Sequence, residues 1–134
     1  MDSSTLINNL VETYKTLNTT YRKATPTDAL TSIITRMRND EVQFSQALKD
    51  RITGIGTAGG PGREYVDGLD TTLAQLISQF GTARATTLNL LKGIHEDRVW
   101  DQPLDDGSTI RAHVQDLVTS DKNQLARLSA AVNS

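Results

Sequence analysis

Apolar residues recur every three to four positions along four long segments of this chain, and this spacing constrains the fold more than any other feature. The segments run from about Ser4 to Arg22, from Thr25 to Ile52, from Asp70 to Lys92 and from Ser108 to Val132. No stretch alternates apolar and polar residues over a useful length, so strands are not expected. Amphipathic helices of this length predict an all-α fold, a four-helix bundle formed by the single domain 1–134.

Residues that cap or stop helices lie at the ends of these segments. Ser3 or Ser4 is expected to cap the first helix, and Thr25 the second. Gly54 is a natural stop for the second helix. Ser108 is expected to cap the fourth helix.

A glycine-rich stretch separates the second and third segments. Residues 53–68 read TGIGTAGGPGREYVDG, a composition typical of a loop. The stretch contains the pattern G-x-G-x-x-G, but a dinucleotide site needs a strand before that pattern and a helix starting within it. Here a predicted helix precedes the pattern and Pro61 follows it closely. We therefore interpret the stretch as a connection between two helical hairpins.

The second and fourth segments repeat each other in their apolar pattern. A shift of 80 positions lays apolar residues on apolar residues: Leu30 on Ile110, Ile34 on Val114, Met37 on Leu117, Leu48 on Leu128 and Ile52 on Val132. Any two amphipathic helices can be aligned in phase, but this shift also lays Glu41 on Asp121. The matching acid favours two pseudo-repeated helical hairpins packed about a pseudo-twofold axis. The same shift relates Arg36 to Asp116, which the repeat predicts to face each other as an ion pair.

Glu41 and Asp121 each interrupt an apolar stripe, with apolar residues three or four positions away on both sides. An ionised carboxylate inside a bundle must be paired, hydrogen-bonded or metal-bound, or else take up a proton. Three arrangements meet this requirement. The carboxylates reach solvent at the edge of the stripe, they accept hydrogen bonds from a neighbouring helix or loop, or they line a central polar pocket.

Composition excludes several classes of function. Fourteen basic and sixteen acidic residues give a net charge of −2, which argues against nucleic-acid binding. The chain has no apolar run long enough to span a bilayer and no signal-peptide pattern, so we expect a cytoplasmic protein without membrane contact. The absence of cysteine excludes thiolate chemistry. The two histidines are too few for a three-histidine metal site, and His113 has no identifiable serine partner for a catalytic triad.

The stretch between Trp100 and Leu128 resembles the last helix of the DinB/YfiT-like superfamily. Residues 107–111, Gly-Ser-Thr-Ile-Arg, match the entry to that helix, and Asp121 matches the aspartate of its His-Asp-x-x-His motif. Residues 29–44 resemble the second helix of the family, in which Glu41 matches a glutamate that follows a histidine by five positions. The resemblance implies a four-helix bundle with an up-down-down-up arrangement. It also implies a divalent metal held by one histidine of the second helix and two of the fourth.

The positions that correspond to those metal ligands carry Arg36, Ser120 and Gln124, none of which is histidine. Zinc and nickel prefer nitrogen or sulfur donors at a site of this kind. We therefore expect a divergent DinB-like bundle without the family's metal cofactor and without metal-dependent activity.

This interpretation predicts a protein that binds a small polar or anionic ligand or serves as an interaction module. The expected ligand site is a central cavity lined by Arg36, Glu41, Asp116, Asp121 and Gln124. Arg36 would supply a cation for a carboxylate or phosphate group. Bundles of the resembling family often pair through helix faces, so a homodimer is a further expectation.

The alternative is a divergent metal-dependent, thiol-dependent transferase or hydrolase of the DinB/YfiT type. It would hold a divalent metal such as zinc or nickel with Glu41, Asp121 and His113. Two aromatic residues lie in predicted connections. Trp100 is expected to anchor its loop on the bundle, whereas for Tyr65 anchoring and lining a ligand pocket are equally expected.

Overall fold

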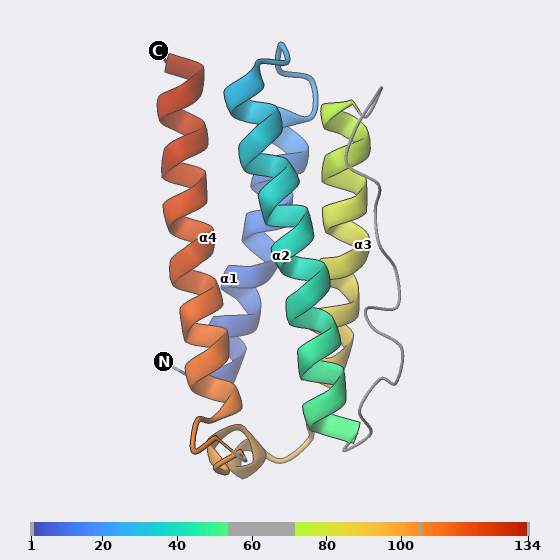
Figure 1. Ribbon diagram of the computed structural model, residues 1–134. Helices are drawn as coiled ribbons and strands as arrows, with labels where there is room; N and C mark the ends of the chain where they lie inside the picture. Colours follow the sequence, from blue (N-terminus) through green and yellow to red (C-terminus); the bar gives the residue numbers. More distant parts are fainter. Residues whose placement is uncertain (1, 54–71, 105, 134) are drawn as a thin grey trace.

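The computed structural model describes residues 2–53, 72–104 and 106–133, which form four long helices (Figure 1). The helices are α1 (Ser3–Thr16), α2 (Asp28–Thr53), α3 (Leu73–Lys92) and α4 (Ile110–Asn133). A π-helical turn, η1 (Leu17–Tyr21), extends α1, and a 3-10 helix, η2 (Asp97–Asp101), lies between α3 and α4. The described ranges contain no strand, which confirms the predicted all-α bundle. Most of the predicted glycine-rich loop, residues 54–68 with Tyr65, lies outside the described residues.

The first helix is capped at Asp2, before both of the predicted caps, Ser3 and Ser4. The backbone N–H of Thr5 donates to Asp2 Oδ1 at 2.7 Å, so Asp2, and not Ser3 or Ser4, is the N-cap. The hydroxyl of Ser3 donates instead to Asp97 Oδ1 of η2 at 2.8 Å. A carboxylate is a stronger acceptor than a hydroxyl, and here it frees the serine to tie α1 to the α3–α4 connection.

Each of the other three helices also begins with a side-chain oxygen that caps a backbone N–H group. Thr27, Thr72 and Thr109 each accept from the backbone N–H three residues later. The cap of α2 is therefore Thr27 and not the predicted Thr25, and the cap of α4 is Thr109 and not the predicted Ser108. The hydroxyl of Ser108 is used elsewhere, in the site described below.

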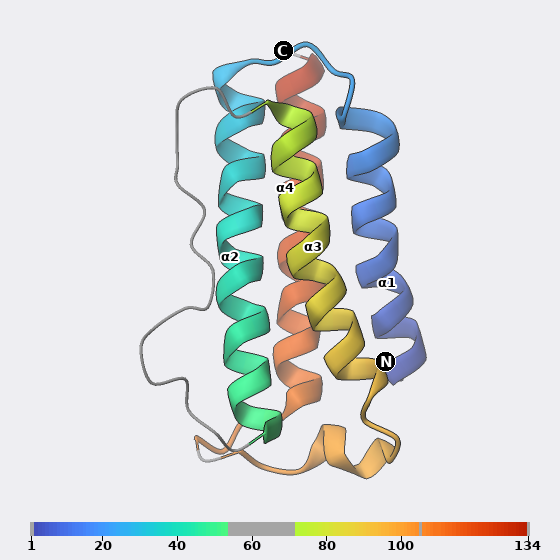
Figure 2. The same ribbon diagram turned by 90° about the vertical axis from the view of Figure 1, so that its right-hand side faces the viewer.

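Two helices run up the bundle and two run down (Figures 1 and 2). In the view of Figure 1, α1 and α4 rise while α2 and α3 descend. Each helix has two neighbours, since α2 and α1 both pack against α3 and α4. The pairs α2–α4 and α1–α3 are therefore antiparallel, and the α2–α3 and α1–α4 pairs are parallel. No helix in the described part of the chain is both long and apolar enough to cross a membrane.

The apolar core consists of two clusters stacked along the bundle. The upper cluster includes Leu17, Ile34, Ile77, Phe80 and Leu128. The lower cluster includes Leu6, Leu48, Leu91, Trp100 and Val114. Between the two clusters every helix contributes polar side chains, so the core is interrupted by a polar layer at mid-height.

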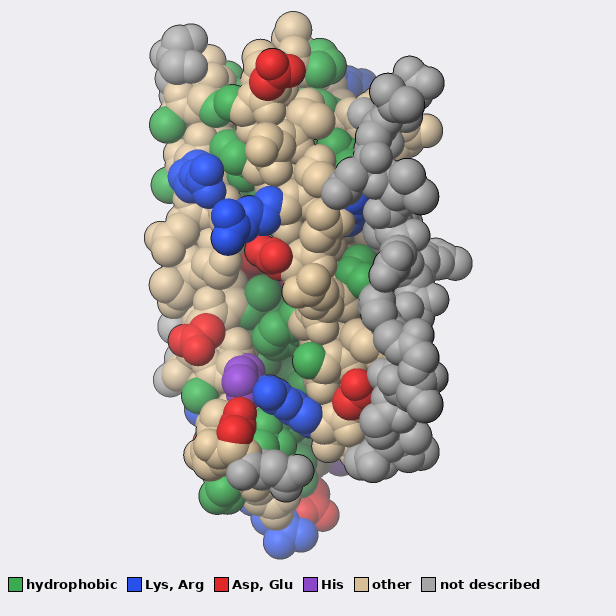
Figure 3. Space-filling view, viewed as in Figure 1, with side chains coloured by type: hydrophobic (Ala, Val, Ile, Leu, Met, Phe, Trp, Pro, Cys, Tyr) green, Lys and Arg blue, Asp and Glu red, His purple; other side chains and the backbone are tan. Residues whose placement is uncertain are grey.

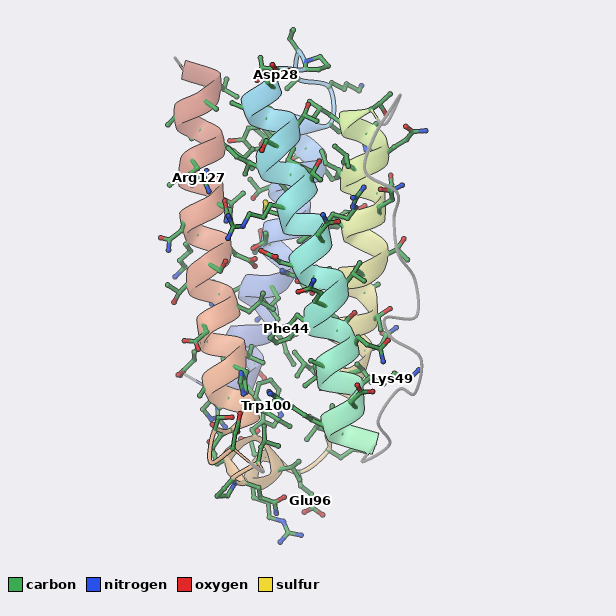
Figure 4. All side chains as sticks on the ribbon, in the orientation of Figure 1. Asp28, Phe44, Lys49, Glu96, Trp100 and Arg127 are labelled. Atoms are coloured by element: carbon green, nitrogen blue, oxygen red, sulfur yellow. The ribbon has the colours of Figure 1, made fainter. Side chains whose placement is uncertain are left out.

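Trp100 is buried in the lower cluster, which confirms the predicted anchoring role (Figure 4). Arg111 of α4 covers its ring, with the guanidinium carbon 5.6 Å from the ring centroid. The predicted apolar stripes are wrong at two positions. Ile52 and Val132 are exposed, because the last turns of α2 and α4 extend beyond the neighbouring helices that bury the rest of each stripe.

Candidate functional site

The polar layer is built around Arg84 of α3, a side chain only 1% exposed. Its Nε and Nη2 atoms donate to the two carboxylate oxygens of Glu41 on α2, both at 2.9 Å. Its Nη1 and Nη2 atoms donate to Asp121 of α4 at 2.9 and 3.0 Å. The guanidinium thus forms bidentate pairs with both acids, the geometry in which this contact is strongest.

All five N–H groups of Arg84 are used, because Nη1 also donates to the carbonyl oxygen of Leu10 at 2.9 Å. The ring of Phe80 lies under the guanidinium, with its centroid 4.8 Å away. Among the described residues no buried side-chain nitrogen or oxygen lacks a partner. Burial alone would lower the pKa of Arg84, but the charges and hydrogen bonds of Glu41 and Asp121 raise that pKa above its ordinary value.

Two threonines complete the layer in a symmetrical way. Thr13 donates to Asp121 Oδ2 and Thr87 donates to Glu41 Oε2, both at 2.8 Å. A shift of 74 positions takes Thr13 of α1 to Thr87 of α3. The same shift takes Leu10 of α1 to Arg84 of α3, and these two residues are in contact. The two threonine–carboxylate pairs thus follow the pattern that the predicted pseudo-twofold axis would give, with arginine at one of the two corresponding positions and leucine at the other.

Glu41 and Asp121 are therefore buried and satisfied by hydrogen bonds from neighbouring helices, the second of the three predicted arrangements. They do not line an open pocket. Arg84 was not among the predicted site residues, although the sequence contains a signal for it. Arg84 lies four residues after Phe80 and four before Leu88, on the apolar stripe of its own segment.

The remaining residues of the predicted central cavity lie elsewhere. Arg36 is exposed and forms an ion pair with Asp40, one turn along its own helix, at 3.7 Å. Asp116 is exposed on α4, and the half-buried Gln124 accepts a hydrogen bond from Arg127 at 3.2 Å. The prediction of a single cavity lined by all five residues is wrong.

The predicted Arg36–Asp116 pair is wrong for a geometric reason. Because α2 and α4 are antiparallel and Glu41 lies level with Asp121, Arg36 lies above that level and Asp116 below it. Each is five residues from its acid, so the helical rise places them about 15 Å apart along the bundle. When two repeated helices run antiparallel, residues at equivalent positions lie at the same height only near the axis that relates the helices.

The positions that the DinB resemblance assigns to metal ligands do not fit a metal. Arg36 and Ser120 are exposed, and Gln124 is half-buried. The alternative metal site needs Glu41, Asp121 and His113 together. Its two carboxylates are not available to a metal, because both are paired with Arg84. In the described ranges no three His, Cys, Asp or Glu residues come together in a metal-binding cluster.

A hollow of about 150 Å³ opens between the lower halves of α2 and α4. Its walls come from α2 and α4: Phe44, Ala47, Leu48, Arg51, Ile110 and His113. We call it the α2–α4 groove. Figure 3 shows hydrophobic side chains along this hollow, with basic, acidic and histidine side chains gathered at its lower end. Phe44 lies between the two helices at the upper end of the groove (Figure 4).

Arg51 and His113 connect the groove to a polar cluster on the turn that precedes α4. Arg51 Nη2 lies 3.7 Å from Asp106 Oδ2. The backbone N–H of Ser108 donates to Asp106 Oδ1 at 3.0 Å, and the Ser108 hydroxyl donates to the same oxygen. The hydrogen bonds from Ser108, aided by the charge of Arg51, hold the pKa of Asp106 below its ordinary value.

The prediction that His113 lacks a serine partner is wrong, since its Nε2 lies 2.7 Å from Ser108 Oγ. The arrangement is nevertheless not a Ser-His-Asp triad. In a triad the acid orients the histidine, whereas here Asp106 bonds to the serine itself. The cluster gathers hydrogen-bond donors around one carboxylate, which is the chemistry of anion binding and not of nucleophile activation.

The chain matches no protein-family model, and it has no significant match among curated proteins or among solved structures.

Proposed function

We propose that this protein is a binding module whose α2–α4 groove takes a small molecule with an apolar body and an anionic group. The observation that carries the proposal is the mixed lining of the groove. Phe44, Leu48 and Ile110 supply apolar walls, and Arg51 and His113 add a guanidinium and an imidazole to the same lining. Apolar pockets with a few convergent polar groups are the usual form of small-molecule sites.

The volume of the groove limits the size of the ligand's apolar part. An apolar cavity of roughly 150 Å³ accommodates a benzene ring, and the α2–α4 groove has about this volume. A planar six-membered ring against Phe44 would bury its faces, while a carboxylate on that ring would reach Arg51. Arginine binds carboxylates through two parallel hydrogen bonds, which adds orientation to charge.

The polar layer is not available to a ligand, and this favours the groove as the binding site. Arg84 has no free N–H group, and its two carboxylates already accept hydrogen bonds from it and from a threonine. A ligand at this level would have to break those contacts inside the bundle. We therefore assign the layer to stability and the groove to binding.

A divergent DinB-like origin is part of the proposal, and the up-down-down-up course of the helices supports it. The residues at the family's metal positions support a binding role in place of metal chemistry. A homodimer and a cytoplasmic location stay predictions.

The test is a titration of the protein with sodium benzoate, followed by calorimetry or by amide chemical shifts. Benzamide, which keeps the ring and lacks the charge, is the matched ligand control. Arg51→Gln should weaken benzoate binding about tenfold, the effect of losing one charge-assisted contact of roughly 1.4 kcal/mol. Arg36→Gln, on the same helix, should leave binding unchanged. Equal losses in both variants, or no binding by the wild type, would contradict the proposal.

A further inference from the structure

The donors at the lower end of the α2–α4 groove already hold a carboxylate, that of Asp106. Three groups converge on it: the guanidinium of Arg51, the backbone N–H of Ser108 and the hydroxyl of Ser108. They divide between its oxygens, with Arg51 near Oδ2 and Ser108 on Oδ1. This part of the chain therefore displays the geometry in which these donors bind a carboxylate.

Resting on the proposed function, we infer that Asp106 is a built-in counter-ion that occupies the place of the ligand's anionic group. A carboxylate ligand entering the groove displaces Asp106 from Arg51 and takes over that contact. The site thus selects carboxylates, because its donors are spaced for one. Asp106 sets how tightly the ligand binds, since ligand and side chain compete for the same cation.

The contact between Asp106 and Arg51 has the features of one that can be exchanged. Its two atoms are 3.7 Å apart, and the side chains of Arg51 and Asp106 are 36% and 55% exposed. Exposed ion pairs in water are weak, because solvent screens them and holding two side chains in place costs entropy. A ligand that also buries an apolar ring against Phe44 brings a contribution that Asp106 lacks.

The turn that carries Asp106 is itself firmly held. Leu104 N–H donates to the carbonyl of Ser108 at 2.7 Å, and Gly107 N–H donates to the carbonyl of Leu104 at 2.8 Å. Gly107 has a φ of +82°, a left-handed conformation that glycine adopts without strain. Displacement therefore requires only the Asp106 side chain to rotate away, while the Ser108 donors remain in place for the ligand.

His113 fixes the orientation of the Ser108 hydroxyl. A serine hydroxyl has one proton, and here it points to Asp106, so His113 Nε2 donates its hydrogen to Ser108 Oγ. When a ligand carboxylate replaces Asp106, the hydroxyl keeps the same direction. His113 is in this sense a positioning residue for the donor set.

Removing the charge of Asp106 tests the inference. When a competing state is lost, the apparent affinity rises by the inverse of the fraction that was free to bind. We expect Asp106→Asn to tighten benzoate binding about three- to tenfold. Asp116→Asn makes the same change of net charge at another exposed acid of this half of the molecule, and it should change the affinity less than about twofold. Asp106→Ala, a second variant without a hydrogen-bonding side chain, should behave like Asp106→Asn.

The outcomes separate this inference from the proposed function. If the wild type binds benzoate and both Asp106 variants bind it equally well or more weakly, displacement is wrong while the groove stays the site. If Asp116→Asn tightens binding as much as Asp106→Asn, the effect is one of net charge and displacement is again wrong. If neither the wild type nor the Asp106 variants bind benzoate, the proposed function falls and the inference falls with it.

A second readout follows the donors directly. In amide spectra, saturating benzoate should shift the Ser108 resonance in the wild type, because its acceptor changes from Asp106 to the ligand. The same resonance in ligand-free Asp106→Ala should already differ from the wild type. A Ser108 resonance that stays unmoved when benzoate binds would overturn the inference.

Discussion

The polar layer and the lower end of the α2–α4 groove use the same components in different surroundings. Each has an arginine, an acidic partner and a hydroxyl that donates to the acid. Arg84 is 1% exposed and lies 2.9 Å from its partners, whereas Arg51 is 36% exposed and lies 3.7 Å from Asp106. Burial and contact geometry, more than residue type, therefore separate a structural arrangement from one that can exchange its partner.

The physical reason is the cost of separating charges in each place. Inside the bundle an unpaired carboxylate has no water to stabilise it, so the three charged groups of the layer depend on one another. At the groove, solvent replaces a lost partner at little cost. The same loss of a contact is therefore expected to affect folding in one region and affinity in the other.

The largest expected effect is on stability, from Arg84→Met. This change leaves Glu41 and Asp121 buried without their cation, which should cost about 3–5 kcal/mol in the free energy of unfolding. The measurement is urea denaturation of the purified variant. Arg51→Met is the matched control and should change that free energy by less than about 0.5 kcal/mol. Similar losses in both variants would break the distinction between the two regions.

A smaller effect should result when the whole charged set is removed together. Replacement of buried ion pairs by apolar residues of similar volume is often neutral or stabilising. The triple variant Arg84→Met, Glu41→Leu, Asp121→Val should therefore regain most of the stability that Arg84→Met alone loses. Thr13 and Thr87 would still donate to the carbonyls of Asn9 and Ala83 within their own helices. A triple variant less stable than Arg84→Met would show that the layer stabilises the fold by more than mutual compensation.

Much of the fold followed from the sequence, because apolar spacing reports which side of each helix faces inward. The four helices lie close to their predicted segments, and Glu41 and Asp121 are buried and hydrogen-bonded, one of the three arrangements that their places on the stripes allowed. Periodicity does not report which residue of one helix meets which residue of another. For this reason the Arg36–Asp116 pair was wrong, whereas Glu41 and Asp121 lie at one level of the bundle and bind the same arginine.

The groove was the harder part to predict. Leu48 was on the predicted inward stripe, but nothing local to Arg51, Asp106 or His113 marked them as neighbours. They meet only because α2 ends where α4 begins. Arg84 could have been predicted from the sequence. A basic residue on an apolar stripe indicates a buried, paired charge, just as an acidic residue does.

The most direct test of the division between the two regions is the map of amide shifts when the wild-type protein is titrated with benzoate. We predict shifts at residues 44–51 and 108–113, which surround the groove, and none at residues 84–87 of the polar layer. Shifts centred on Arg84 and Asp121, with the groove unaffected, would contradict the account.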